Sequence, residues 1–374
     1  MKRAVFITNI PSPYRVDFFV YLQKNYPQYE FHIIFSGAGM ENRKWSVELG
    51  ELSNYVFLKS KTLIIRKRFD DRYVFLPVGV ERTLRELKPD VVFAMEYNPT
   101  ILRAVHWCRK RRIPFISWTD GTLHAERNFG KVQRLARRYV IPRAAAFVAS
   151  STASKQAQIA YGADEKKCFL SYLTVDIEKY LRRKDGYGGK QLIYVGSLIQ
   201  RKGLDLLLAA LARTDGDIRL VIVGEGQEKE LLLKQAKELG IPERIDFKGY
   251  VEGEALRALY AGSDVFILPT REDCFGLVIL EAMCASLPVL SSKYADGAFD
   301  LVEEGKNGYL VDPEDTAAFA ARIGELFADE DRLAAMGKRS YEKAHEFAFS
   351  EVSKGCIAAL EYVLAQKDRR NHNE

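Results

Sequence analysis

Short apolar runs, rich in β-branched and aromatic side chains, alternate with longer amphipathic segments along the whole chain. Runs of this kind are typical of strands buried in parallel sheets. In the first half, the predicted strands cover residues 4–8, 31–35, 90–94, 114–118 and 145–150. Apolar positions with helical spacing lie between them, at residues 15–26, 78–87 and 100–112.

The second half repeats this alternation. Its predicted strands cover residues 191–196, 219–224, 245–249, 264–269 and 288–292, and its predicted helices cover 203–211, 228–240, 252–261 and 277–285. Strand–helix alternation implies right-handed βαβ units, so we predict an α/β protein with two Rossmann-like, doubly wound domains. Such folds bind ligands at the carboxyl ends of their strands, and two in tandem predict an interdomain cleft.

Length and composition indicate an ordinary globular protein. The 374 residues are 47% hydrophobic and 28% charged, which suits two domains. No run approaches the roughly 18–20 apolar residues of a membrane span, and Asn9 and Pro11 make the first apolar stretch too short for a secretory signal. The five cysteines form no C-x-x-C pair, which favours a reducing compartment. We therefore expect a cytoplasmic protein.

Charge divides the chain in two. Residues 1–190 contain 34 Lys and Arg against 18 Asp and Glu, whereas the remainder contains 22 against 32. Such asymmetry is expected when one half faces an anionic surface or ligand. It supports an interdomain linker at residues 182–190, where several glycines interrupt regular structure. The predicted domains are residues 1–183 and 184–351, followed by a terminal segment, 352–374.

The loops after the predicted strands carry the chemical signals. The first strand runs into Asn-Ile-Pro-Ser-Pro, without the glycines of a dinucleotide-binding turn, and the chain has no P-loop sequence. Gly224 and Gly226 follow a strand and serve either a tight turn or the approach of backbone N–H groups to an anion. Gly196 ends another strand, and Lys202 begins the next helix, where its ammonium can reach a phosphate or stay a solvated charge.

Two carboxylates lie on either side of a predicted helix start. Asp273 follows a buried strand, and Glu281 lies eight residues later, inside a largely apolar helix. The backbone amides between them, at residues 275–277, would form a helix N-terminal anion site. We interpret the two carboxylates as groups that bind sugar and ribose hydroxyls. The alternative is helix capping by Glu272 or Asp273, with Glu281 on a solvated face.

These motifs resemble glycosyltransferase family 4 (group 1), retaining enzymes of the GT-B fold. The resemblance is carried by GSLIQRKG, IVGEGQ, KGYV, LYAGSDVFILPTREDCFGLVILEAM, and SLPVL followed by EEGKNGYLVDPED. The first half matches more loosely, through NIPSPYRVDFF, SWTDG and the AAFVASS run. The resemblance implies a nucleotide-diphosphate sugar donor, UDP- or GDP-linked, in the C-terminal domain, an acceptor in the N-terminal domain, no cofactor, and a last helix that returns to the N-terminal domain.

The resemblance also implies roles for single residues. Lys202 and the amides of Phe275, Gly276 and Leu277 would bind the donor diphosphate. Asp273 would hold hydroxyls of the transferred sugar, and Glu281 the ribose. Further donor contacts are implied at Gly196, Gly224, Gly226, Tyr250 and Val251.

The sequence departs from the family pattern at two positions. The family usually has glutamate where Asp273 stands, so the shorter side chain would alter sugar preference. The arginine that often follows the strand-end glycine is Ser197, for which Arg201 is a substitute.

On the acceptor side, Asp120 stands where many family members have a histidine that faces the acceptor, and His124 lies nearby. Tyr14 and Arg15 follow a proline-stiffened loop, at a helix start that would face the cleft. Core packing of the apolar residues beside them explains that segment equally well.

The sequence predicts no metal site. Two D-x-D spacings, at residues 215–217 and 329–331, are interpreted as a turn and a helix start, and the five histidines are widely separated. We predict metal-independent transfer with retention, in which Lys202, Arg201 and the helix terminus neutralise the leaving diphosphate. The diphosphate would assist deprotonation of the acceptor on the same face. The residues expected to act in catalysis are Asp120, Lys202, Asp273 and Glu281.

Basic segments in the first half suggest an anionic partner. A helix predicted at residues 127–140 has an apolar side (Val132, Leu135, Ala136, Tyr139, Val140) and a basic side (Lys131, Arg134, Arg137, Arg138). Basic runs at 66–68 and 109–112 add to it, although cations also favour helix ends. We predict peripheral binding at the inner face of the cell membrane and a lipid-linked or other anionic acceptor. Nucleic acid is not expected, because no recognition motif accompanies the charge.

Two other functions are compatible with this pattern. One is another GT-B enzyme, such as a nucleotide-sugar 2-epimerase, which the paired carboxylates and Lys202 disfavour. The other is a catalytically silent scaffold in a glycan-assembly complex, which the departures at Ser197 and Asp273 allow.

Overall fold

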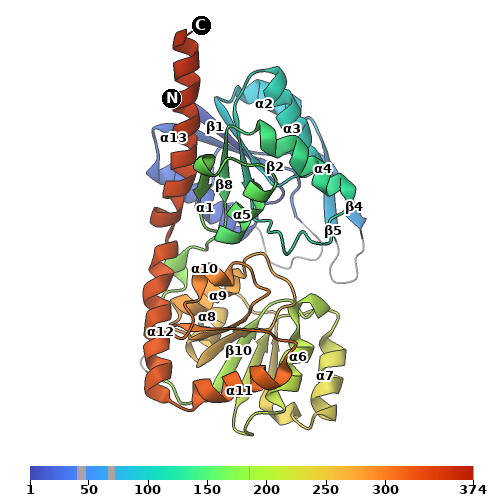
Figure 1. The fold of residues 1–374 in the computed structure, drawn as a ribbon, viewed down its shortest axis with the longest axis vertical. Helices are drawn as coiled ribbons and strands as arrows, with labels where there is room; N and C mark the ends of the chain where they lie inside the picture. Colours follow the sequence, from blue (N-terminus) through green and yellow to red (C-terminus); the bar gives the residue numbers. More distant parts are fainter. Residues whose placement is uncertain (40–47, 66–71, 185, 374) are drawn as a thin grey trace. The chain divides into compact units, whose positions relative to one another are not determined.

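The computed structural model describes residues 1–39, 48–65, 72–184 and 186–373. It contains two compact units (Figure 1). The first comprises Met1–Asp176 and Phe349–Glu374, and the second comprises Ile177–Ala348. The limits thus fall a few residues before the predicted boundaries at 183/184 and 351/352.

The predicted linker, residues 182–190, belongs to the second unit, which corrects its interpretation as a connection between domains. Lys184 Nζ contacts Asp264 Oδ1 at 2.8 Å, and both side chains are almost fully buried. The Tyr187 hydroxyl donates to the carbonyl of Ser286 at 2.5 Å. The described residues of this segment form no helix or strand, but the long side chains of Lys184 and Tyr187 fix it to the second unit.

A seven-stranded parallel sheet, ordered β3-β2-β1-β6-β7-β8-β9, forms the centre of the first unit. Its strands are β1 (Lys2–Thr8), β2 (Tyr29–Phe35), β3 (Tyr55–Phe57), β6 (Val91–Met95), β7 (Phe115–Thr119), β8 (Ala146–Ala149) and β9 (Cys168–Leu170). The five strands predicted here are confirmed. The hydrophobic pattern does not predict β3 and β9, because three residues are too few to show a period.

Helices cover both faces of this sheet. They are α1 (Pro13–Asn25), α2 (Val80–Leu87), α3 (Pro99–Lys110), α4 (Lys131–Val140), α5 (Thr152–Ala160) and α13 (Phe349–Asn373). Phe6 of β1 shares a core with Phe19 of α1 and Leu360 of α13. Ile7, the next residue of β1, lies in the opposite core with Leu84 of α2 and with α3.

An antiparallel pair of strands, β4 (Lys59–Ile65) and β5 (Arg72–Val78), also belongs to the first unit. The sequence pattern does not predict it, because β4 mixes lysines with apolar residues and several apolar side chains of the pair are exposed. The pair shortens the helix predicted at 78–87: Val78 ends β5, and Gly79 turns the backbone at φ 94° before α2.

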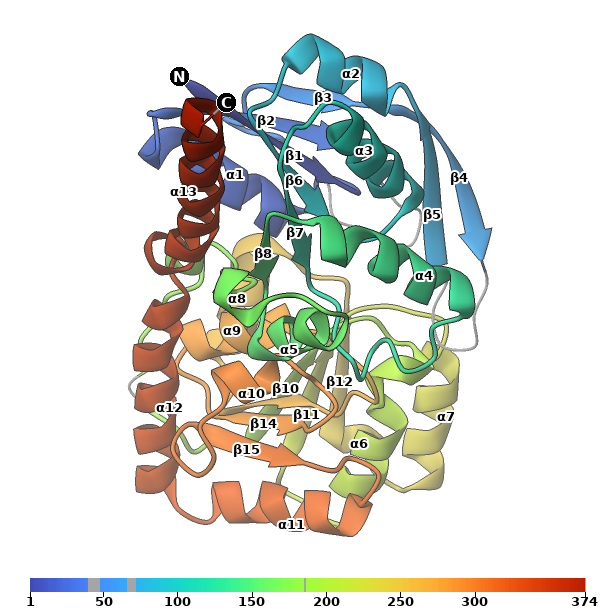
Figure 2. The ribbon, with the colours of Figure 1, turned by 45° about the horizontal axis from the view of Figure 1, so that its top comes forward.

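The second unit has a six-stranded parallel sheet, ordered β12-β11-β10-β13-β14-β15 (Figure 2). Its strands are β10 (Gln191–Val195), β11 (Arg219–Val223), β12 (Ile245–Gly249), β13 (Val265–Leu268), β14 (Val289–Ser292) and β15 (Gly308–Val311). Its helices are α6 (Leu204–Leu211), α7 (Lys229–Glu238), α8 (Gly253–Ala261), α9 (Leu277–Cys284), α10 (Ala298–Leu301), α11 (Thr316–Phe327) and α12 (Glu330–Ala344). All five strands and four helices predicted here are confirmed, as are the two doubly wound domains.

Candidate active-site residues

Lys202 and Asp273 form an ion pair in the second unit. Lys202 ends a single helical turn, Gln200–Lys202, which follows β10, and Asp273 lies in the loop after β13. Lys202 Nζ donates to Asp273 Oδ2, and the two side chains are 13% and 17% exposed. Beside them, Arg201 Nη1 donates to the carbonyl of Glu272 at 2.8 Å.

Backbone hydrogen bonds fix the position of Asp273. Its N–H donates to the carbonyl of Tyr294 at 3.0 Å, and its carbonyl accepts from the N–H of Asp296 at 2.9 Å. Burial acts to raise the pKa of Asp273, but the charges of Lys202 and Arg201 outweigh it and hold the pKa below its usual range. The carboxylate therefore stays ionised.

The start of α9 lies directly after Asp273. The Phe275 N–H donates to Asp273 Oδ1 at 3.3 Å, and Gly276 precedes the helix with φ 80°, a left-handed conformation that glycine adopts without strain. The first N–H groups of a helix have no carbonyl partner within it. The Phe275 amide thus contacts the carboxylate that pairs with Lys202, directly before the start of α9.

Glu281 extends from the same helix toward aromatic hydroxyls. Tyr260, which is fully buried on α8, donates its hydroxyl to Glu281 Oε2 at 2.9 Å. Burial raises the pKa of Glu281 to about 7, although hydrogen bonds from Tyr260 and Tyr180 act to lower it. The alternative of a solvated face for Glu281 is therefore wrong.

The glycine turns are explained by close backbone contact. A Cβ on Gly224 would overlap the carbonyl oxygen of Gly196, and one on Gly226 would overlap that of Leu198. Gly196 and Gly224 also have φ of 156° and 139°. These glycines are needed for the turns themselves, whether or not a ligand also binds there.

The remaining donor-side candidates lie on loops of the same unit. The carbonyl of Ser197 accepts from the Tyr194 hydroxyl at 3.0 Å. Tyr250 is 41% exposed and donates its hydroxyl to Glu252 Oε2 at 2.6 Å, and Val251 follows it in the loop after β12.

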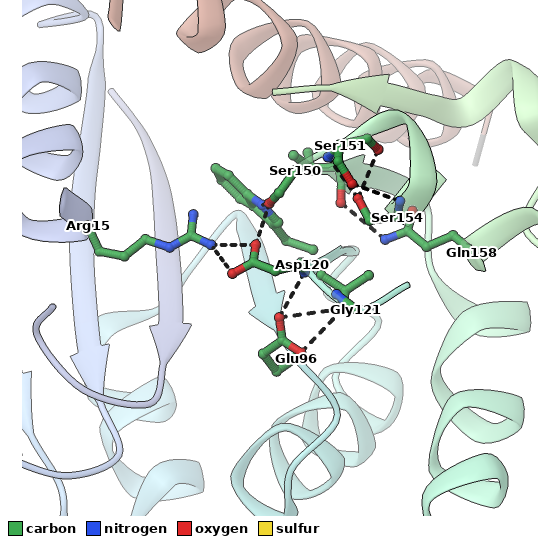
Figure 3. A network of polar contacts seen from close by, with 11 residues as sticks. Arg15, Glu96, Asp120, Gly121, Ser150, Ser151, Ser154 and Gln158 are labelled. Carbon is green, nitrogen blue, oxygen red and sulfur yellow. Dashed lines mark hydrogen bonds and ion pairs between the residues drawn. The ribbon is translucent and has the colours of Figure 1, made fainter. Parts of the chain in front are cut away.

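In the first unit, Arg15 and Asp120 come together at the ends of α1 and β7 (Figure 3). Arg15 Nη2 donates to Asp120 Oδ1 at 2.7 Å and to Oδ2 at 2.9 Å. Ser150 also donates to Asp120 Oδ1 and accepts from Trp118 Nε1 at 2.9 Å. The Arg15 guanidinium lies 5.1 Å from the Trp118 ring centre, so Arg15 is part of a buried polar network and not only of apolar packing.

Glu96, directly after β6, is a member of this network that the sequence analysis did not single out. Its Oε1 accepts from the Asp120 N–H at 3.0 Å (Figure 3). Burial and the neighbouring charge of Asp120 raise the pKa of Glu96 to about 7. The available signal was its place as the first charged residue after a buried strand.

The other two acceptor-side candidates are Tyr14, which lies beside Arg15, and His124, which lies in a separate loop. The Tyr14 ring lies 5.6 Å from the Arg15 guanidinium. His124 belongs to the loop before α4, where its carbonyl accepts from Arg127 at 2.9 Å. That loop also holds Glu126, which pairs with Arg137 of α4.

The ion pair between Glu126 and Arg137 corrects the faces predicted for the basic helix. Arg137 is 5% exposed and lies 4.5 Å from the Tyr97 ring centre, whereas Val132 and Leu135 are 80% and 62% exposed. Helix α4 begins at Lys131 instead of 127, after Gly130. The basic run at 66–68 lies outside the described residues.

A cavity of about 240 Å³ lies between this loop, α4 and α5. It is lined by Leu123, Glu126, Arg127, Arg134, Ala160 and Tyr161. Because Arg137 compensates Glu126, the two arginines leave the lining positively charged.

The D-x-D segments serve local structure. Asp217 pairs with Lys190 at 2.6 Å, and Asp329 caps α12 by accepting from the Arg332 N–H at 2.9 Å. Within the described part of the chain, no three His, Cys, Asp or Glu side chains are grouped as metal ligands would be. Nor does any helix in the described ranges have the length and apolar character needed to cross a membrane.

Comparisons with known proteins agree with this architecture. Residues 174–343 match the family model for glycosyl transferases group 1, and residues 22–179 match that for glycosyltransferase family 4. The chain is 35% identical over 173 residues to a GDP-mannose-dependent alpha-(1-6)-phosphatidylinositol monomannoside mannosyltransferase of Mycolicibacterium smegmatis, covering 43% of this chain and 45% of that protein. It is 30% identical over 249 residues to a D-inositol 3-phosphate glycosyltransferase of Corynebacterium urealyticum, covering 60% and 58%. The chain spans about half the length of the curated relatives it matches.

Solved structures share the fold over nearly the whole chain. Anabaena Alr3699/HepE in complex with UDP aligns with a TM-score of 0.75 and 20% identity, covering 96% of this chain and all of that one. The lipopolysaccharide outer core galactosyltransferase WaaB, in its apo form, aligns with a TM-score of 0.73 and 19% identity, covering 96% and 99%. With two adjoining family matches and this architecture, the chain belongs to the group 1 glycosyltransferases of family 4 and has the GT-B fold.

Proposed function

We propose that the protein is a retaining glycosyltransferase that moves a hexose from a nucleotide-diphosphate sugar to a glycan or lipid-linked acceptor. The observation that carries this proposal is the grouping of Lys202, Asp273 and the amides that begin α9. A cation and N–H donors suit a diphosphate. The carboxylate of Asp273 suits the hydroxyls of the transferred sugar, and that of Glu281, on α9, suits the hydroxyls of the ribose.

The proposed chemistry follows from the charges. Breaking the sugar–phosphate bond leaves negative charge on the diphosphate, which must be stabilised. Lys202 supplies a full positive charge, and Arg201 lies beside it. The start of α9 adds a partial positive charge. In this mechanism the diphosphate needs no metal ion. It takes the proton of the acceptor hydroxyl as that oxygen attacks the anomeric carbon from the same face.

The donor would be UDP- or GDP-linked. A solved structure with the same fold is titled as a UDP-glucose complex, and a curated relative is named as GDP-mannose-dependent. In this proposal, the remaining contacts to the nucleotide come from the loops that hold Gly196, Ser197, Gly224, Gly226, Tyr250 and Val251.

A panel of UDP-, GDP-, ADP- and CDP-sugars in a thermal-shift assay tests donor binding. A donor at a hundred times its Kd stabilises the protein by about 2.7 kcal/mol. Lys202→Ala should abolish the shift, whereas Lys190→Ala, which removes a lysine from an exposed pair with Asp217, should keep it. Full turnover in both Lys202→Ala and Asp273→Asn would instead favour the silent scaffold. Turnover that stops with EDTA and returns with Mg²⁺ would contradict the metal-independent mechanism.

We infer further that the first unit meets an anionic acceptor at the inner face of the cell membrane, in the cytoplasm. The cavity lined by Arg127 and Arg134 suits a phosphate or carboxylate. On α4, the exposed Val132 and Leu135 lie close in sequence to Lys131, a combination that suits an anionic lipid surface.

Vesicle flotation tests the membrane proposal. Phosphatidylglycerol vesicles should bind the protein and phosphatidylcholine vesicles should not. Leu135→Asp should reduce binding, and Leu231→Asp, at a similarly exposed position on α7, should not. Equal binding to both vesicle types would contradict the proposal.

A further inference from the structure

Glu96 and Asp120 follow the neighbouring strands β6 and β7 of the first sheet, but their carboxyl groups accept different numbers of hydrogen bonds from the surrounding protein (Figure 3). Asp120 Oδ1 accepts from Arg15 at 2.7 Å and from Ser150, and Oδ2 accepts from Arg15 at 2.9 Å. A carboxylate oxygen accepts about two hydrogen bonds. Asp120 thus uses three of about four acceptor positions within its own unit, and both of its oxygens are held by Arg15.

Glu96 keeps acceptor capacity. Its Oε1 accepts from the Asp120 N–H at 3.0 Å. Its Oε2 has a single partner among the described residues, the Thr119 hydroxyl, at 3.3 Å. That hydroxyl also lies 3.4 Å from Oε1, and its one proton cannot serve both oxygens well. The side chain is half-buried, so it is not sealed from solvent.

The backbone holds Glu96 in place at the sheet edge. Its φ of 71° is left-handed, which is uncommon for a residue other than glycine and tends to occur at functional sites. Its N–H donates to the carbonyl of Trp118 at 2.8 Å, which ties β6 to β7 at this point. The carboxyl ends of parallel strands are where doubly wound folds bind ligands.

Charged and titratable groups from several elements face Glu96. Asp120 follows β7, Arg15 comes from α1, Arg137 comes from α4, and Tyr97 is the next residue. The two guanidiniums favour ionisation, whereas burial and Asp120 oppose it. Glu96 is therefore able to exchange a proton near neutral pH, unlike a carboxylate that a cation pairs directly.

We propose that Glu96, and not Asp120, is the carboxyl group that receives the reacting hydroxyl of the acceptor, through Oε2. Asp120 is then a positioning residue, which orients Glu96 through its backbone N–H and is itself fixed by Arg15 and Ser150. This inference rests on the proposed transferase function. An ionised Glu96 binds a hydroxyl more strongly than a neutral one, so acceptor affinity rises as Glu96 loses its proton.

Steady-state kinetics of the full chain between pH 5.5 and 8.5 test this inference. The donor is the UDP- or GDP-sugar that gives the largest thermal shift, and the acceptor is an octyl glycoside, or water if no glycoside reacts. In the wild type, kcat/KM for the acceptor should rise with pH through about 7. Glu96→Gln should lower kcat/KM for the acceptor roughly tenfold or more at pH 8, flatten the pH profile and leave donor affinity unchanged.

Two further variants separate binding from structure. Glu81→Gln removes a carboxylate that pairs with Arg103 elsewhere in the unit and should leave the profile unchanged. Asp120→Asn should move the inflection to lower pH, because the negative charge that opposes ionisation of Glu96 is lost.

The outcomes distinguish a failure of the proposed function from a failure of the role assigned to Glu96. If the wild type neither binds nor consumes any nucleotide sugar, the proposed function fails and the inference fails with it. If the wild type turns over but Glu96→Gln behaves like Glu81→Gln, the proposed function stands and the role of Glu96 is refuted. An equal loss of donor affinity in Glu96→Gln also refutes it, because the effect would then be structural.

Discussion

Glu96 and Asp273 occupy corresponding places in the two sheets, yet their chemistry is opposite. Each follows the strand that pairs with the first strand of its unit: β6 pairs with β1, and β13 pairs with β10. At Asp273, Lys202 and Arg201 outweigh burial and hold the pKa below its usual range. At Glu96, burial and Asp120 raise the pKa to about 7.

The difference shows that the carboxyl end of a strand places the carboxyl group, whereas the nearest charged side chain sets its pKa and therefore its chemistry. A carboxylate paired directly with a lysine stays ionised and suits permanent hydroxyl binding beside a diphosphate. A carboxyl group whose neighbour is another carboxylate keeps a proton that it can exchange. Substitutions at the neighbours therefore test the comparison better than changes to the fold.

The largest expected effect comes from Lys202→Ala. It removes the cation that would stabilise the leaving diphosphate, and turnover should fall by roughly a hundredfold or more. The pKa of Asp273 should rise as well, since the charge that lowers it is lost. Initial rates with a saturating donor measure the first effect. A loss below tenfold would contradict the assigned role, and Lys190→Ala provides the surface control.

Besides lowering turnover, Asp273→Asn should reduce stability. It leaves Lys202, 13% exposed, without its carboxylate, and the free energy of unfolding should fall by about 2 kcal/mol. Urea denaturation measures this change. In Asp217→Asn, whose lysine partner is exposed, the change should stay below about 1 kcal/mol. Similar losses in both variants would mean that burial does not distinguish the two pairs.

Raised pKa values predict a fall in stability with increasing pH. Glu96 and Glu281 titrate from the ordinary value of 4.5 when unfolded, but near 7 when folded. Between these values the folded state holds more protons, so both groups reduce stability as pH rises from about 5 to 7. The melting temperature of Glu281→Gln relative to the wild type should rise over this range.

Glu303→Gln is the control for this pH dependence. Hydrogen bonds from Arg339 lower the pKa of Glu303 to about 2, so its contribution to stability is lost only as pH falls below about 4.5. A constant difference in melting temperature between Glu281→Gln and the wild type from pH 5 to 8 would contradict the raised pKa.

The smallest expected effect is that of Ser150→Ala. It removes the hydrogen bond that Ser150 donates to Asp120 and the one that it accepts from Trp118 Nε1, and it leaves both bonds from Arg15. The free energy of unfolding should fall by about 1.5 kcal/mol, with no change in donor affinity. A large loss of donor binding would show that this network does not act on the acceptor side alone.

The sequence by itself determined the two doubly wound sheets and the group around Lys202 and Asp273. Buried parallel strands need continuous apolar runs, and those runs are visible at single-residue level. Lys202, Asp273 and the amides of α9 come from loops that directly follow β10 and β13, two paired strands, so strand order alone brings them together.

Only the tertiary structure decided which side chains contact each other outside the group around Lys202 and Asp273. Residues 182–190 contain linker-like glycines, yet Lys184 and Tyr187 anchor them. The charge on Arg137 indicated a solvated face, but Glu126 and aromatic rings bury it. Glu96 looked like one more charged residue after a strand. Its chemistry depends on Asp120, Arg15 and Arg137, which are distant in sequence, and periodicity reports only the burial of neighbours along one element.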